Sequence, residues 1–198
     1  MADAVLLIDG CGANLASLRF ALERLGQDPA VSSDPDRIAN AQRVILPGVG
    51  AAGYAMERLR ELGLDQVVPA LRQPVLGICL GMQLLLERSG EDDTACLGAI
   101  PGRCVRFTPA PERPIPHMGW NRVQPTAGHP LFAGVDAGAH CYFVHSFKAP
   151  LSEHTAAATT YGERFAAAVS RENFFGVQFH PERSGQTGAR ILANFLGL

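Results

Sequence analysis

The sequence predicts an α/β fold with a central, mostly parallel sheet, helices on both faces and an additional antiparallel β section. The first half alternates short apolar runs with helical patterns, which is typical of a doubly wound parallel sheet. The stretch 96–123 is interrupted by prolines, which suits short antiparallel strands and loops. No repeat, low-complexity tract or linker is visible, so we expect residues 1–198 to form a single domain.

In the first half, apolar runs of strand length lie at residues 4–9, 43–46 and 75–79. Asn14 can cap a helix over residues 15–25, whose leucines recur at helical spacing before Gly26 ends it. A second helix is expected through Met56, Leu59 and Leu62, and a third from Leu80 to about Glu87. In the second half we expect strands at residues 141–149, 156–160, 165–170 and 174–179, followed by an amphipathic helix over 188–196.

Composition limits the classes of function. The 198 residues are 47% hydrophobic and 18% charged, enough apolar material for a substantial core. The net charge of -2 comes from interspersed signs without a basic stripe, which argues against a nucleic-acid partner. Asp3 stands where a signal peptide needs basic residues, and no apolar stretch reaches the ~20 residues of a membrane span. We therefore expect a cytoplasmic protein without membrane contact.

The cysteines do not form a disulfide or metal framework. There are five, an odd number, without a C-x-x-C pair or histidines at zinc spacing: Cys11, Cys79, Cys96, Cys104 and Cys141. Most are expected to be inert thiols of a reducing compartment, and we expect neither a metal nor a cofactor.

Cys79 differs because it lies in Gly77-Ile-Cys-Leu-Gly81, after an apolar strand and at the start of a helix. This is the context of a nucleophile elbow, in which glycines relieve the crowding of a sharp turn. The helix N-terminus favours a thiolate and leaves the Leu80 amide free to stabilise an oxyanion. The alternative is a buried structural cysteine beside glycines that only permit close packing.

A thiolate nucleophile needs a base, and His180 is the strongest candidate among six histidines. It ends the apolar run 174–179 and precedes Pro181 and Glu182. Residues two apart in extended backbone point to the same side, so the Glu182 carboxylate could orient the imidazole. The alternative is an exposed strand end. His129, His140 and His154 are expected on the surface.

The two motifs Gly77-Ile-Cys-Leu-Gly-Met-Gln83 and Gln178-Phe-His-Pro-Glu182 together resemble the class I (triad) glutamine amidotransferases, which have a three-layer α/β fold. Four further stretches resemble the glutaminase subunits of imidazole glycerol phosphate synthases: residues 46–50, 116–121, 142–146 and 179–184. The similarity runs from Ile8 to the last helix, so we expect no fused synthase domain. It implies that Cys79, His180 and Glu182 hydrolyse glutamine to glutamate and ammonia.

The resemblance also implies roles for other residues. The second oxyanion donor would come from Gly48, Val49 or Gly50, where glycines permit a peptide flip. Without the cysteine motif, that loop would be an ordinary turn. Glutamine-binding candidates are Gln83, Glu91, Ser146 and Phe147, each of which could equally be a solvated or packing residue.

The implied partner is a cyclase subunit, a (β/α)8 barrel that uses the ammonia to make imidazole glycerol phosphate and aminoimidazole carboxamide ribotide in histidine biosynthesis. The candidate interface residues are His117, Met118, Trp120, Asn121 and Arg183. Core packing for Trp120 and a solvated Arg183 are the alternatives.

The chain departs from the family pattern at three places. Gly10 stands where an aromatic residue is usual, and Phe147 and Arg183 replace the commoner Tyr and Lys. Cys11 is a possible second thiol near the site. Rival interpretations are an amidotransferase serving anthranilate, aminodeoxychorismate or guanylate synthesis, a protease-like cysteine elbow, and a non-catalytic subunit. In the protease-like class a histidine follows the nucleophile directly, whereas Leu80 follows Cys79 here.

Overall fold

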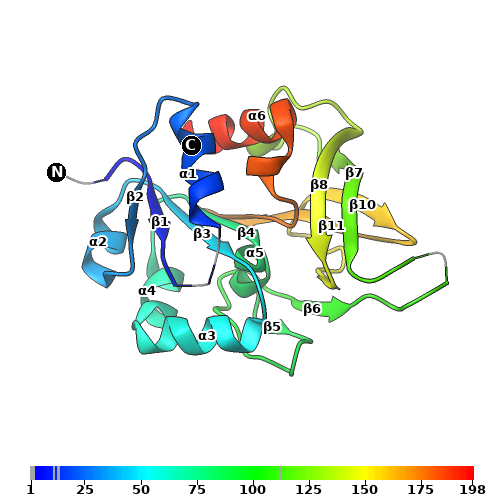
Figure 1. Ribbon diagram of the computed structural model, residues 1–198, viewed down its shortest axis with the longest axis horizontal. Helices are drawn as coiled ribbons and strands as arrows, with labels where there is room; N and C mark the ends of the chain where they lie inside the picture. Colours follow the sequence, from blue (N-terminus) through cyan, green and yellow to red (C-terminus); the bar gives the residue numbers. More distant parts are fainter. Residues whose placement is uncertain (1–2, 11, 13, 112) are drawn as a thin grey trace.

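The computed structural model describes residues 3–10, 12, 14–111 and 113–198. Within this part, a nine-stranded sheet of order β2-β1-β3-β4-β12-β11-β10-β7-β8 runs through the molecule (Figure 1). Its strands are β1 (Leu6–Ile8), β2 (Ala30–Ser32), β3 (Val44–Gly48), β4 (Val75–Cys79), β7 (His117–Pro125), β8 (Ala139–His145), β10 (Thr155–Tyr161), β11 (Glu163–Arg171) and β12 (Phe174–Val177).

The predicted fold class is confirmed. Strands β2, β1, β3, β4 and β12 pair in parallel. From β12 through β11, β10 and β7 to β8 every pairing is antiparallel. The antiparallel section therefore continues the parallel sheet rather than forming a separate layer. A smaller sheet joins β5 (Arg88–Ser89), β6 (Arg103–Arg106) and β9 (Phe147–Lys148).

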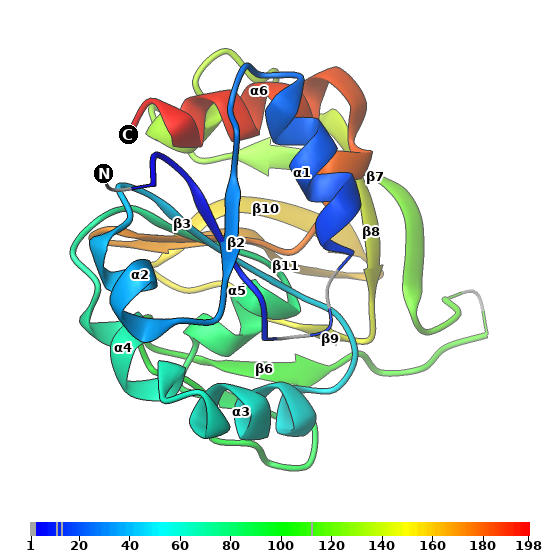
Figure 2. The ribbon, with the colours of Figure 1, turned by 60° about the vertical axis from the view of Figure 1, so that its left-hand side comes forward.

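Helices cover both faces of the sheet and complete three layers (Figure 2). On one face lie α1 (Leu15–Glu23) and α6 (Gly185–Leu196), whose buried residues share a core with Leu7 of β1. On the other face lie α2 (Pro35–Asn40), α3 (Ala52–Glu61), α4 (Leu64–Ala70) and α5 (Leu80–Leu85), which pack with Leu6 and Ile8. The alternation along β1 thus supplies both cores.

Several elements differ from the sequence expectation. Asn14 caps α1, as predicted, by accepting from the Ser17 amide at 3.3 Å. We did not predict β2, α2 or α4. The short β2 lies at the sheet edge and is only partly buried, which hides its pattern. In α2, an Asp34 N-cap followed by Pro35 was a readable start signal.

Strand β3 runs two residues further than predicted and includes Pro47 and Gly48. Pairing between β1 and β3 ends at Ile45, so the missing N–H of Pro47 removes no bond to β1. In the second half, β8 ends at His145 and Ser146 separates it from β9, so the strand expected over 141–149 is broken. Strand β7 was not placed by the sequence because prolines crowd its start.

Among the described residues, no helix combines the length and the apolar character that a membrane crossing requires.

Candidate active site

The sequence motifs converge where three neighbouring parallel strands end. Gly48 at the end of β3 lies opposite Cys79 at the end of β4, and Val177 at the end of β12 lies opposite Ile78. His180 follows β12 by three residues. The carboxyl ends of parallel strands are where α/β sheets usually place their sites.

Cys79 occupies a strained backbone position between β4 and α5. Its φ of 54° and ψ of -109° are unusual for a residue with a Cβ atom. The flanking glycines are required by close backbone approach. A Cβ on Gly77 would lie 2.6 Å from the Gly81 carbonyl oxygen, and one on Gly81 would lie 1.8 Å from the Leu46 carbonyl oxygen. The predicted strand-turn-helix elbow is therefore confirmed.

The Cys79 thiol lines a pocket of about 290 Å³. Its Sγ donates to the Val144 carbonyl at 3.7 Å and accepts from Gln178 Nε2 at 3.8 Å. The pocket brings together most of the residues that the sequence assigned to catalysis, oxyanion binding and glutamine binding: Val49, Gly50, Cys79, Leu80, Gln83, Glu91, Ser146, Phe147 and His180. Gly48 lies beneath them in β3, where its lack of a Cβ admits Leu80 and Gly81.

His180 and Glu182 are in contact, with His180 Nδ1 donating to Glu182 Oε1 at 2.8 Å. Both side chains are buried. The backbone is not extended as predicted, because Pro181–Arg183 forms a 3-10 turn that returns the carboxylate to the imidazole. His180 Nε2 is buried without a hydrogen-bond partner among the described residues. This nitrogen is available to a ligand in the pocket.

The electrostatics favour a protonated His180. Burial opposes the charge, but interactions with Cys79 and Glu182 outweigh it and raise the pKa of His180 to about 10. An imidazolium in this pocket is suited to protonating a leaving group.

Backbone contacts from the antiparallel section hold His180. Its amide donates to the Tyr142 carbonyl at 2.9 Å. Ser184 Oγ donates to the His180 carbonyl at 2.6 Å and accepts from the Tyr142 amide at 3.0 Å. Strand β8 therefore positions the histidine, while β4 positions the cysteine.

Two features of the pocket suit an oxyanion. The Leu80 amide lies in the first turn of α5, where amides lack intrahelical acceptors. The Val49-Gly50 peptide lines the same pocket, and Gly50 has a φ of +91°. With the thiol and the imidazole, this arrangement can form and hydrolyse an acyl-cysteine intermediate.

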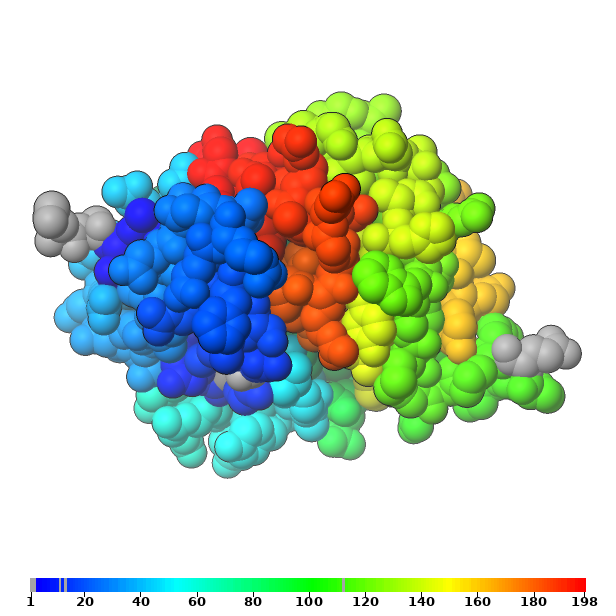
Figure 3. Space-filling model, turned by 45° about the horizontal axis from the view of Figure 1, so that its top comes forward, coloured from blue at the N-terminus to red at the C-terminus, as the bar shows by residue number. Residues whose placement is uncertain are grey.

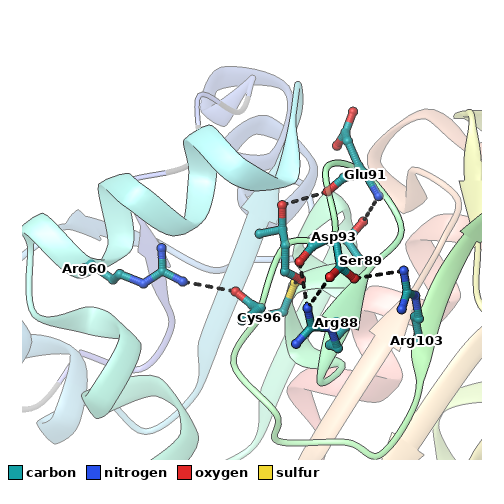
Figure 4. Close-up of polar contacts among 9 residues, drawn as sticks. Arg60, Arg88, Ser89, Glu91, Asp93, Cys96 and Arg103 are labelled. Atoms are coloured by element: carbon teal, nitrogen blue, oxygen red, sulfur yellow. Dashed lines mark hydrogen bonds and ion pairs between the residues drawn. The ribbon is translucent and has the colours of Figure 1, made fainter.

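Glu91 reaches the pocket from a loop that ion pairs brace (Figure 4). Asp93 bonds to Arg88 at 2.7 Å and to Arg103 at 2.9 Å. The Glu91 carboxylate points away from this cluster, and its Oε2 accepts from the Ala52 amide at the start of α3 at 2.7 Å. The loop thus holds a carboxylate at the pocket edge.

The side-chain nitrogen of Gln83 is bonded to protein groups, whereas a residue that binds substrate through this atom would leave it free. Gln83 is 5% exposed, and its Nε2 donates to the Phe147 carbonyl at 3.1 Å and to Gln178 Oε1 at 2.9 Å. Its amide nitrogen therefore ties the pocket wall together. Gln178, which sequence reasoning left without a role, was detectable as the one polar residue in the apolar run 174–179.

One interface prediction, that for His117, needs correction. Along β7 the side chains alternate, so Met118 and Trp120 are 63% and 58% exposed whereas His117 is buried. Asn121 is half-buried, and its amide contacts His117, the Thr160 carbonyl and the Arg122 amide. Period-two alternation therefore turns His117 into the interior, whereas the half-buried Asn121 stays a predicted interface residue.

Trp120, Tyr142 and Arg183 are in contact at the surface, and Met118 is exposed on the same face of β7 as Trp120; these four residues are here called the aromatic patch. The Trp120 and Tyr142 rings meet edge to face at 6.0 Å, and the Arg183 guanidinium lies 4.5 Å from the Tyr142 ring centre. Figure 3 shows β7 (green) beside β8 (yellow), and β8 beside the segment around His180 (orange). Tyr142 was missed as a surface residue.

The remaining sequence candidates among the described residues lie outside the pocket. Cys11 falls outside the described residues. Burial raises the pKa of Cys96 to about 11 and that of Cys141 to about 12, so both stay protonated at neutral pH. His129 is not the solvated residue expected, because it is half-buried and hydrogen-bonded to Ser170 Oγ at 2.8 Å.

Comparison with known proteins agrees with this geometry. The family model described as glutamine amidotransferase class-I matches residues 8–197. Proteins named imidazole glycerol phosphate synthase subunit HisH from Xylella fastidiosa and Shewanella oneidensis are 54% and 50% identical to the chain. These alignments cover 97% and 98% of this chain and 96% and 95% of the two relatives.

Solved structures show the same fold. A crystal structure of a glutamine amidotransferase matches with a TM-score of 0.74 at 20% identity, covering 98% of this chain and 97% of the other. The PurLQS structure from Thermotoga maritima matches with a TM-score of 0.74 at 18% identity, covering 100% and 99%. With the full-length sequence matches, these findings show that the chain belongs to the class-I glutamine amidotransferases and, within them, to the family of imidazole glycerol phosphate synthase subunit HisH.

Proposed function

We propose that this protein hydrolyses glutamine to glutamate and ammonia through Cys79, His180 and Glu182. The observation that carries the proposal is the strained elbow that presents the Cys79 thiol in the same pocket as His180, whose other nitrogen is bonded to Glu182. The family match supports a carboxamide as the group attacked.

The reaction proceeds in two steps. Cys79 Sγ gives its proton to His180 Nε2 and attacks the side-chain carbonyl carbon of glutamine as a thiolate; the tetrahedral oxyanion then collapses, the C–N bond breaks, and His180 Nε2 passes the proton to the departing ammonia. A γ-glutamyl thioester remains. Water then adds to it while His180 takes a proton, and the C–S bond breaks to give glutamate and the free thiol. Glu182 stabilises the imidazolium that His180 forms in each of the two steps.

Substrate contacts come from the pocket wall. The amides of Leu80 and of the Val49-Gly50 segment bind the oxyanion, and Gly48 supports that segment from below. Glu91 binds the α-ammonium group, and the backbone of Ser146 and Phe147 contacts the rest of glutamine. Gln83 acts through the wall it holds in place rather than by a direct bond from its amide nitrogen.

The names of the relatives support delivery of ammonia to a cyclase subunit of imidazole glycerol phosphate synthase in histidine biosynthesis. We assign the partner a (β/α)8 barrel and the complex a heterodimer with lyase activity, in which ammonia passes directly between sites. The aromatic patch is the proposed contact surface. Residues 1–198 act as one domain, which the continuous nine-stranded sheet supports. Location in the cytoplasm stays a prediction from the sequence.

The decisive experiment is Cys79→Ala in the complex with the cyclase. Synthesis from glutamine should fall by at least about 10³-fold, because the nucleophile is gone, while synthesis from added ammonia persists. Both are measured as product formation with each nitrogen source. Undiminished use of glutamine would refute the mechanism. Recovery of an anthranilate-type synthase, rather than a barrel cyclase, in co-purification would refute the assigned partner.

A further inference from the structure

A chain of buried polar groups ends on the wall of the glutamine pocket. The Phe147 residue lines that pocket, and its carbonyl oxygen accepts from His145 Nδ1 at 2.7 Å and from Gln83 Nε2 at 3.1 Å. The second ring nitrogen of His145 lies 2.9 Å from Nδ1 of His117, directly across the β7-β8 pairing. Neither histidine has a role in the proposed chemistry.

The directions of these hydrogen bonds follow from the groups at the two ends of the series, the Phe147 carbonyl and the Asn121 amide. A carbonyl can only accept, so His145 Nδ1 carries the proton and its Nε2, when the ring is neutral, accepts. His117 Nδ1 must then donate, which makes its Nε2 an acceptor. That nitrogen lies 3.2 Å from Asn121 Nδ2, a donor that also bonds to the Thr160 carbonyl at 2.9 Å. Every bond therefore points from Asn121 towards Phe147.

The surroundings keep both rings neutral. His117 and His145 are 3% and 6% exposed, and burial lowers their pKa values to about 4 and about 3. His117 stacks between Phe143 and Tyr161, with ring centres 4.9 and 4.2 Å away. The nearby charged groups are His180, which disfavours protonation of His145, and Lys148, which lies over the Phe107 ring and pairs with Glu163. Protonating either ring would place two donors face to face.

The end of this hydrogen-bonded series that is farther from the pocket lies behind the aromatic patch. Asn121 and His117 occupy the inward face of β7, and Trp120 and Met118 occupy the outward face of the same strand. A shift of β7 along β8 would therefore change the distance between the two histidines directly. The relay connects the strand proposed to contact the cyclase with a carbonyl in the glutamine pocket.

We propose that His117 and His145 are positioning residues for glutamine: a relay of two neutral imidazoles that holds the Phe147 carbonyl in the pocket wall and links it to strand β7. The inference rests on the proposed glutaminase function for its kinetic consequence. Because the relay touches the wall and not the reacting atoms, its loss should weaken substrate binding, raising KM while kcat changes little.

The first test needs no activity. In the chain labelled with ¹⁵N-histidine, both rings should give the nitrogen shifts of the Nδ1–H tautomer and stay neutral from pH 5 to 8. A free imidazole prefers a proton on Nε2, so this signature is not expected by default. An Nε2–H tautomer at either residue, or titration of either near pH 6.5, would overturn the relay whatever the enzyme does.

The second test is kinetic and uses the complex with the cyclase. His117→Phe keeps a ring between Phe143 and Tyr161 but removes both nitrogens, and should raise KM for glutamine about 3- to 10-fold with kcat within about 2-fold. His129→Phe is the matched control, since it removes another half-buried, hydrogen-bonded histidine away from the pocket. It should leave KM unchanged. Equal KM values in wild type and His117→Phe would overturn the proposal.

Two further variants separate positioning from folding. His145→Asn retains an amide near the place of Nδ1 that can donate to Phe147, so it should retain a lower KM than His145→Phe. Asn121→Ala leaves both rings in place and should raise KM about 2- to 3-fold even if a ring substitution fails to fold. If these variants have the same KM for glutamine as the wild type, the relay is contradicted. Wild type without any glutamine turnover would instead refute the proposed function, and the tautomer result would still stand.

Discussion

The two halves of the central sheet position active groups by different physical means. In the parallel half, the backbone itself places Cys79, because β3, β4 and α5 approach so closely that Gly77 and Gly81 have no room for a Cβ and Gly48 has little. In the antiparallel half, a backbone hydrogen bond from Tyr142 of β8 holds His180, and hydrogen-bonded side chains of β7 and β8 reach the pocket wall. Strands β7 and β8 alternate, so that one face buries hydrogen-bonded histidines and the other exposes aromatic residues.

This difference implies different tolerance to change. A crowded backbone junction cannot relax around an added methyl group, since its neighbours are themselves main chain. A side-chain network can lose one hydrogen bond and keep its packing. The proposed triad depends on both halves, with Cys79 on β4 and His180 held by Tyr142 of β8. Substitutions on each side should therefore fail in different ways.

The largest effect is expected at the backbone junction. Gly81→Ala would place a Cβ 1.8 Å from the Leu46 carbonyl oxygen, so the variant should lose about 3 kcal/mol of unfolding free energy or more, or fail to fold. Denaturant unfolding measures this. Gly53→Ala in α3 is the control, because its Cβ would meet Thr94 Oγ1 at an ordinary 3.6 Å. It should be neutral or stabilising by up to about 1 kcal/mol. Equal stability of the two variants would contradict the crowding argument.

Glu182→Gln should change the unfolding free energy less than Gly81→Ala does, but it should lower the reaction rate strongly. The amide cannot stabilise the His180 imidazolium and can donate to its Nδ1, so kcat with glutamine should fall roughly 10²- to 10⁴-fold. Synthesis from added ammonia in the same complex is the internal control. Retention of more than a third of the wild-type kcat would show that Glu182 is dispensable.

The same substitution should shift the pH profile. Glu182 helps to raise the pKa of His180 to about 10, above the ordinary value near 6.5. The stabilisation from the charged imidazole is thus complete below pH 6.5 and is lost as the pH rises through 10. In Glu182→Gln that pKa falls, so the alkaline limb of kcat/KM should move to lower pH. An unmoved or upward-shifted limb would contradict this assignment.

The aromatic patch should affect association rather than chemistry. Trp120 is 58% exposed on the outward face of β7, and exposed tryptophans are common anchors of protein interfaces. Trp120→Ala should weaken binding to the cyclase by about 2 kcal/mol, roughly 30-fold in Kd. Tyr54→Ala, on α3 away from β7 and β8, removes another exposed aromatic ring and should not change Kd (Figure 1). Titration calorimetry with both variants separates a specific anchor from general loss of apolar surface.

The comparison also explains what could be predicted from sequence. The elbow was predictable because its determinants are local, five consecutive residues between a strand and a helix. The approach of His180 to Glu182 was predictable from their spacing, although the 3-10 turn that achieves it was not. Close packing of glycine against backbone leaves a visible motif, so the parallel half could be interpreted residue by residue.

The antiparallel half was less predictable because its contacts join distant residues. Gln83 meets Gln178 across 95 positions, and His117 meets His145 across 28, so no local pattern indicates either pair. Treating residues 116–121 as one surface motif overlooked the alternation that a strand imposes. The residue types were informative, but their inward or outward direction depended on a strand that prolines concealed.

The smallest effect is expected where the two halves touch at the surface. Arg183 follows Glu182, and its guanidinium lies 4.5 Å from the ring centre of Tyr142 on β8. A solvent-exposed cation-π contact is worth about 0.5–1 kcal/mol, so Arg183→Ala should lower the unfolding free energy of the isolated chain by that amount. Denaturant unfolding of the chain alone measures the loss, and Arg183→Lys should recover part of it because the positive charge remains. The contact with Tyr142 already exists in the free chain, so its loss alone should not change the Kd for the cyclase. A higher Kd in Arg183→Ala would therefore indicate that Arg183 also contacts the cyclase. An unchanged unfolding midpoint in Arg183→Ala would show that the two halves are joined at His180 and Ser184 and not at this surface pair.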